Sequence, residues 1–245
     1  MRVGWAVLGA AVGVVVGVAA MGCGEPVEAP RHAVEVFADG SRLGPVETDL
    51  GYQVTLEWVE VWIDTVEFTV GGEEHGSATA RWLGRLLPRA HAHPGHASGG
   101  EVAGELRGPV LARFAAGDRE SLGEGEFLEG EYMGFNLIFG ADETAVRMGG
   151  VVDVDGAEVE FEGSVELFPS ARVGGGAIQG VVPTEGAVMI RVEPFDEWEG
   201  KTLFDGISFG ALPAEDGVLQ IRPGTSAGAQ LVNAVLAHEF YSGAF

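Results

Sequence analysis

The chain has 245 residues, of which 37 are acidic and 14 are basic, and its formal net charge is −23. Such a surface repels the phosphates of nucleic acids and of anionic lipids, so we expect neither as a partner. The 40 glycines and 11 prolines favour many turns over long helices, and a single cysteine excludes a disulfide within the chain.

The first 23 residues have the layout of an export signal. Arg2 supplies positive charge, an apolar run extends from Val3 to Ala20, and small residues precede Cys23. Nothing in this segment is expected to belong to the folded domain. The run is close to the roughly 20 residues that span a bilayer, so a retained membrane anchor is one alternative, and another type of secretory signal is a second.

The segment Ala20-Met21-Gly22-Cys23 resembles the lipobox of bacterial lipoprotein signal peptides. The resemblance implies that residues 1–22 are cleaved off and that Cys23 is the lipidation site, with acyl chains on its thiol and amino group. Residues 23–31 would then tether the domain to a membrane. On this basis we expect an exported protein, lipid-anchored at the periplasmic or outer-surface face.

Strand patterns dominate residues 32–245, which we expect to form a single domain. Val151–Phe161 is predicted to be a hairpin, because Asp155-Gly156 suits a type I′ turn in which both central residues have positive φ. Gln53–Val70 is predicted to turn back near Asp64 as a second hairpin. Further strands are expected at His32–Phe37, Val102–Phe114, Tyr132–Phe139 and Val188–Val192.

The predicted fold is all-β: an antiparallel β-sandwich with a long His-bearing loop and one short C-terminal helix. The helix is predicted to run from Ser226, as its cap, to about Phe240. A weaker helical turn is expected over Asp196–Lys201, and a flexible loop at Gly174–Gly176. Five aromatic residues are expected in the core, namely Trp58, Trp62, Phe68, Phe135 and Phe139.

A His-rich segment, residues 71–101, holds the candidate metal ligands. In an extended backbone the imidazoles of His91 and His93 lie on the same side, with Cα atoms about 7 Å apart. A Pro-Gly turn then brings His96 toward them, and His75 is a candidate fourth ligand. Such a set suits Zn²⁺, Cu²⁺ or Ni²⁺. The alternative is a solvated loop with no specific ligand.

The same segment carries Trp82. In this respect, and in composition, the chain is similar to secreted bacterial copper-binding proteins of the methanobactin-associated partner class, some of which bind copper through histidines and an oxidised tryptophan. The resemblance favours copper among the three metals and assigns no ligand.

No pattern in the sequence indicates catalysis. Asp153-Val-Asp155-Gly begins like a calcium loop but lacks the later ligands, and His238-Glu239 lacks the second histidine of a zinc protease. His238 instead suits a helix end. We therefore expect no enzyme, but a membrane-anchored lipoprotein that binds a transition metal. The alternative is an acidic interaction or structural module at the cell envelope, with a protein or glycan partner and neither metal nor catalysis.

Overall fold

The computed structural model describes residues 30–70, 100–140, 144–168, 170–182 and 186–245. This part of the chain is all-β with a single α-helix, as predicted. The strands are β1 (Arg31–Asp39), β2 (Pro45–Glu47), β3 (Gln53–Val70), β4 (Glu101–Ala115), β5 (Arg119–Leu128), β6 (Gly130–Phe139), β7 (Val146–Val154), β8 (Ala157–Val165), β9 (Arg172–Val182), β10 (Val188–Val192), β11 (Phe195–Asp196), β12 (Lys201–Thr202), β13 (Ala214–Glu215), β14 (Val218–Ile221) and β15 (Tyr241–Ala244). The helical elements are η1 (Phe209–Ala211), α2 (Ser226–Val235) and η2 (His238–Phe240).

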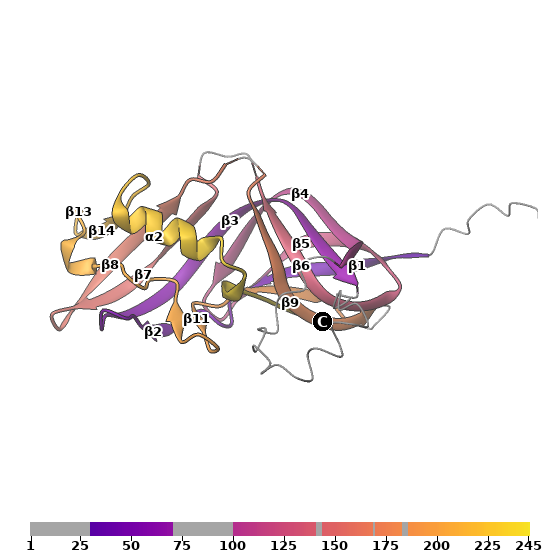
Figure 1. Cartoon of the computed structure of the whole chain (residues 1–245), viewed down its shortest axis with the longest axis horizontal. Helices are drawn as coiled ribbons and strands as arrows, with labels where there is room; N and C mark the ends of the chain where they lie inside the picture. Colours follow the sequence, from indigo (N-terminus) through magenta and orange to yellow (C-terminus); the bar gives the residue numbers. More distant parts are fainter. Residues whose placement is uncertain (1–29, 71–99, 141–143, 169, 183–185) are drawn as a thin grey trace, which may run out of the picture.

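Strand β3 belongs to one 13-stranded sheet and pairs with different strands along its first and second halves (Figure 1). Its first half pairs with β7, and the sheet continues through β8, β14 and β13. Its second half pairs with β6, while β4 pairs with Trp58–Val70 along the other edge. From β4 the order is β5, β1, β10, β15, β9 and β6, so the pairing returns to β3 and closes a ring.

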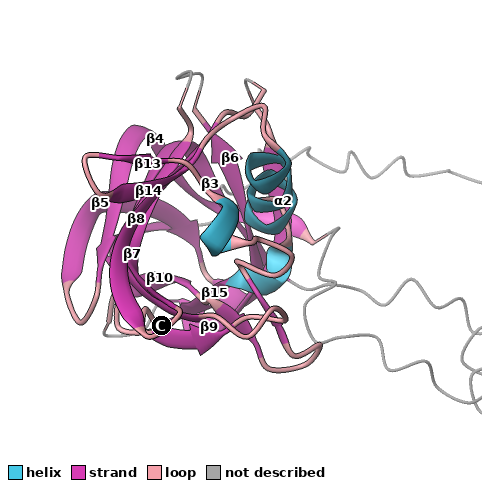
Figure 2. Ribbon diagram, turned by 90° about the vertical axis from the view of Figure 1, so that its left-hand side faces the viewer, coloured by secondary structure: helices cyan, strands magenta, loops and turns pink. Residues whose placement is uncertain are grey.

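The strands of this ring curve around a common interior, with α2 beside them (Figure 2). Strands on opposite sides face each other across the core, so the predicted sandwich-like arrangement is confirmed. Most pairings are antiparallel, and the parallel ones in the described residues are β1 with β10, β14 with β8, and β15 with β9. Among these residues, the search for a helix of sufficient length and hydropathy to cross a membrane finds none.

The predicted hairpin within residues 53–70 is wrong, because β3 continues through Asp64 as one strand of 18 residues. The register shifts between Ile63 and Thr65 against both β4 and β6. This irregularity marks the place where the strand leaves β7 and joins β6. Bulges bend and twist a strand, which suits a change of partner. Asp64 therefore marks a bulge and not a turn.

The predicted β7–β8 hairpin is confirmed. Asp155 and Gly156 have φ values of 55° and 83°, as a type I′ turn requires. The backbone N–H of Gly156 donates a hydrogen bond to Asp153 Oδ1 at 2.7 Å. The carboxylate of Asp153, which lies in the sequence pattern of a calcium loop, thus stabilises the turn.

Two aromatic clusters fill the core. Inside the closed ring of strands, the centroid of the Phe127 side chain lies 4.7 Å from that of Phe68 and 5.4 Å from that of Tyr132. The second cluster lies at β8, outside that ring of strands: the centroid of the Phe161 side chain is 5.4 Å from those of both Phe204 and Phe209. Three of the predicted core residues are confirmed, since they are at most 1% exposed: Phe68, Phe135 and Phe139.

Glycines make room for aromatic rings on neighbouring strands. Trp58 and Trp62 are only partly buried, so their assignment to the core is wrong. A Cβ atom on Gly149 would lie 2.6 Å from the indole of Trp58, which therefore lies across that glycine. Likewise, a Cβ on Gly176 would lie 2.5 Å from the ring of Phe135. The glycine run 174–176 lies within strand β9, so the loop predicted there is wrong.

The predicted helix is present but shorter than expected. Its N-cap is Thr225, whose Oγ1 accepts a hydrogen bond from the N–H of Gly228 at 3.0 Å, and not Ser226. It ends at Val235, and the chain continues through η2 into β15. Phe240 lies in η2, and β15, which pairs with β10, begins directly after it.

Asp39, the last residue of β1, is fully buried. Its Oδ2 accepts a hydrogen bond from Arg191 Nε at 2.9 Å, and its Oδ1 accepts one from the Ser41 N–H at 3.0 Å. Burial acts to raise the pKa of Asp39, but the hydrogen bonds from Ser41 and Arg191 outweigh it and lower the pKa below its ordinary value. The resulting stabilisation is present above the unfolded-state pKa and is lost as the pH falls through the folded-state pKa.

Candidate functional site

The sequence-predicted site residues lie outside the described residues: Cys23, His75, His91, His93 and His96. Within the described residues, no group of three or more His, Cys, Asp or Glu side chains is placed to hold a metal ion. The lipidation and metal hypotheses therefore remain predictions from the sequence.

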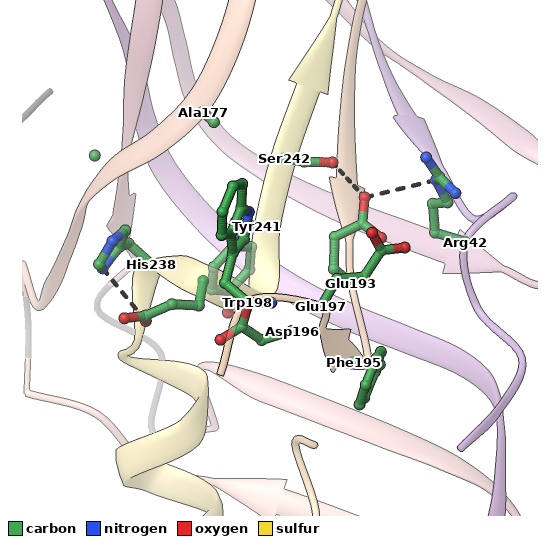
Figure 3. A pocket seen from close by; sticks show the side chains of 12 residues that line it. Arg42, Ala177, Glu193, Phe195, Asp196, Glu197, Trp198, His238, Tyr241 and Ser242 are labelled. Atoms are coloured by element: carbon green, nitrogen blue, oxygen red, sulfur yellow. Dashed lines mark hydrogen bonds and ion pairs between the residues drawn. The ribbon is translucent and has the colours of Figure 1, made fainter. Parts of the chain in front are cut away.

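A hollow of about 240 Å³ lies where distant parts of the chain meet (Figure 3). Its walls come from the loop after β1, from β9, from residues 193–198, from η2 and from β15. We call it the acidic pocket, because four carboxylates and one guanidinium belong to its described lining. These charged residues are Glu193, Asp196, Glu197, Glu239 and Arg42.

The short β11–β12 hairpin positions Trp198 at the acidic pocket. Asp196 is 5% exposed, and its carboxylate accepts hydrogen bonds from the N–H groups of Trp198, at 2.9 Å, and Glu199, at 3.1 Å. These bonds form a tight turn that fixes the backbone of Trp198. The backbone N–H of Gly200 also donates a hydrogen bond to the carbonyl of Asp196 at 2.9 Å, so the single helical turn predicted over Asp196–Lys201 is present, joining β11 to β12. The indole of Trp198 is nevertheless 71% exposed, and the ring of Phe195 is 43% exposed.

Figure 3 shows Glu193 on one side of Trp198 and His238 on the other. On one side, Glu193 accepts a hydrogen bond from Ser242 Oγ, and its Oε1 lies 3.7 Å from Arg42 Nε. On the other side, Glu239 Oε2 lies 3.3 Å from His238 Nδ1. His238 follows α2 closely, as predicted, but lies in η2 and lines the pocket.

The wall formed by β15 is held by a buried tyrosine. Tyr241 is 5% exposed, and its hydroxyl donates a hydrogen bond to the carbonyl of Val235 at 2.9 Å. Burial raises the pKa of Tyr241 above its ordinary value, so the hydroxyl stays protonated and neutral. This bond also fixes β15 against the end of α2.

Side-chain hydrogen-bond acceptors predominate over free donors in the acidic pocket. Carboxylates only accept hydrogen bonds when ionised, and the hydroxyl of Ser242 already donates to Glu193. The guanidinium of Arg42 lies beside the same carboxylate. The pocket therefore presents to a ligand mainly acceptors, negative charge and an aromatic surface.

Comparison with family models, curated proteins and solved structures finds no match to this chain.

Sequence reasoning missed the acidic pocket because its residues come from five separated segments. One local signal was present. Residues 193–199 read Glu-Pro-Phe-Asp-Glu-Trp-Glu, in which two large aromatic residues stand among four acids. Aromatic residues in so polar a stretch are poorly placed for a core, and this contrast indicates an exposed aromatic surface.

Proposed function

We propose that the protein is an exported, lipid-anchored binding module and that the acidic pocket holds its ligand. Export and anchoring are supported by the leader and by Cys23 in the sequence. Binding is supported chiefly by Trp198, whose indole is largely exposed while its backbone is fixed by the buried Asp196. An exposed tryptophan with a fixed backbone beside a hollow is typical of recognition sites, because an indole offers a large contact area with only two rotatable side-chain bonds to order.

A ligand-observed NMR screen of a fragment library against the full chain in detergent tests this function. We expect fragments that bind the wild-type protein to lose at least tenfold in affinity with Trp198→Ala, because the indole is the largest apolar surface offered by the pocket. A tenfold loss corresponds to about 1.4 kcal/mol. The free energy of unfolding should change by less than about 0.5 kcal/mol, since the side chain is on the surface.

Phe168→Ala is the matched control for the screen. Phe168 is 87% exposed and does not line the acidic pocket, so its removal should leave fragment binding unchanged. The proposed function is wrong if no fragment binds, or if both variants bind the same fragments as the wild-type protein does.

Metal binding through the His-rich segment is a second candidate, favoured by the spacing of His91, His93 and His96 in the sequence. Calorimetric titration of the full chain with Cu²⁺ and Zn²⁺ tests it. Replacing all three histidines with alanine should weaken the preferred metal at least tenfold, because each imidazole supplies one metal–nitrogen bond. His238→Ala should have no such effect. Equal, weak binding by the triple variant and the wild-type protein would overturn the hypothesis.

A further inference from the structure

The acidic pocket differs in charge and in hydrogen-bonding capacity from a general apolar pocket. From these differences we infer that its ligand is a primary alkylammonium group, that is, a protonated primary amine on a short carbon chain. This inference rests on the proposed function and adds the chemical class of the ligand.

The charges of the acidic pocket favour a cation. Arg42 lies 3.7 Å from Glu193, so its charge is offset within the pocket. Glu197 and Glu239 add negative charge, although His238 lies 3.3 Å from Glu239 and the charge of Lys201 acts on Glu239 and Asp196. The four carboxylates of the lining still outnumber these basic groups, on a protein whose net charge is −23. A like-charged lining repels anions and raises the local concentration of cations.

Donor and acceptor matching separates an ammonium ion from a neutral sugar. An ammonium group of the lysine type has three N–H donors and no acceptor. A sugar hydroxyl needs donors as well as acceptors from its site. The described lining offers four carboxylates as acceptors, while the hydroxyls of Ser242 and Tyr241 already donate to Glu193 and Val235. The remaining side-chain donors are the guanidinium of Arg42, which lies beside Glu193, the indole N–H of Trp198 and the ring of His238, so acceptors predominate. The ammonium group is therefore the better complement.

Trp198 supplies the contact for the carbon chain and for the charge. The face of an indole attracts a cation within about 6 Å of its centroid, and this contributes roughly 0.5–2 kcal/mol. The exposed ring of Phe195 adds further apolar surface in the same lining.

The size of the hollow limits the ligand. Pockets for drug-sized molecules span roughly 300–1,000 Å³, whereas the acidic pocket holds about 240 Å³. It thus accommodates one small amine, or one side chain such as that of lysine. Both sources present the same alkylammonium group.

Calorimetric titration of the full chain in detergent, at 0.15 M salt, tests the inference with five probes. 1,5-Diaminopentane represents free primary amines, and lysine with both backbone ends capped represents a side chain. Choline carries the same type of charge without an N–H donor, while maltose and succinate represent neutral and anionic ligands. We expect 1,5-diaminopentane or the capped lysine to bind more tightly than choline, and neither maltose nor succinate to bind. Which amine binds more tightly distinguishes a free amine from the side chain of a partner.

Two pocket variants and one control locate the binding. Trp198→Ala and Glu197→Gln should each weaken the amine at least tenfold, the first through the lost aromatic face and the second through the lost charge. Glu158→Gln removes an exposed carboxylate beside the β7–β8 turn and should have no effect. Equal weakening by all three variants, or by none, would overturn the inference, because it would indicate general attraction to an acidic surface.

Failure of the inference is distinguishable from failure of the proposed function. If maltose or succinate binds and Trp198→Ala abolishes that binding, the pocket is a ligand site but the alkylammonium class is wrong. If the amine probes do not bind while the fragment screen finds other ligands that depend on Trp198, the same conclusion follows. If neither the probes nor the fragments bind, both the inference and the proposed function fail.

Discussion

Gly150→Ala is expected to lower the free energy of unfolding by about 3 kcal/mol, at the upper end of the range for overpacked sites. A Cβ atom on Gly150 would lie 2.0 Å from the carbonyl oxygen of Thr55 on the adjacent strand. No rotation of a side chain can relieve a clash between Cβ and backbone. Strands β3 and β7 would have to separate at the place where their register already shifts between Leu56 and Trp58. The measurement is the midpoint of urea unfolding followed by circular dichroism.

Gly44→Ala is the matched control, because nothing lies within 4 Å of a Cβ built there and its φ is not positive. Its free energy of unfolding should differ from that of the wild-type protein by less than about 1 kcal/mol. Equal midpoints for the two alanine variants would contradict the account of β3–β7 pairing given above.

Cys23→Ala is expected to abolish incorporation of fatty acid into the protein completely, since the thiol is the proposed attachment point. Cells supplied with a labelled fatty acid should yield labelled wild-type protein and unlabelled variant. The conservative variant Met21→Leu keeps the cysteine and should retain the label.

The mass of the purified protein separates the three interpretations of the leader. A lipoprotein should have a mass equal to that of residues 23–245 plus acyl chains. An unlabelled protein that retains residues 1–22 would indicate a membrane anchor, and an unlabelled protein cleaved after the leader would indicate another secretory signal. Either unlabelled result would overturn lipidation at Cys23.

Local patterns predicted the elements whose causes are local. The β7–β8 hairpin follows from Asp155-Gly156, because positive φ at both positions is a property of those two residues and their neighbours. By contrast, the irregularity at Asp64 reflects the exchange of β7 for β6 as partner of β3, and these strands lie far away in the sequence. The turn predicted near Asp64 is therefore wrong, because the exchange of partners that causes the irregularity depends on strands outside that segment.

The acidic pocket was harder to predict for the same reason. His238 and residues 196–201 were each noticed in the sequence, but for helical properties. Their common role depends on β15, which pairs with β10 and places η2 opposite the β11–β12 hairpin. Likewise, the glycine run 174–176 has the composition of a loop. In the structure it lies in a strand, where Gly176 leaves room for the side chain of Phe135 on β6.

The position of β15 in the ring also sets the order in which the fold can be completed. Residues 241–244 lie between β10 and β9, and without them no described strand joins those two walls. The ring of strands that contains β3, residues 53–70, therefore cannot close until nearly the whole chain is present. Proteins in which many contacts join residues far apart in the sequence fold slowly. During synthesis from the N-terminus, this ring of strands therefore cannot close until residues 241–244 have been made.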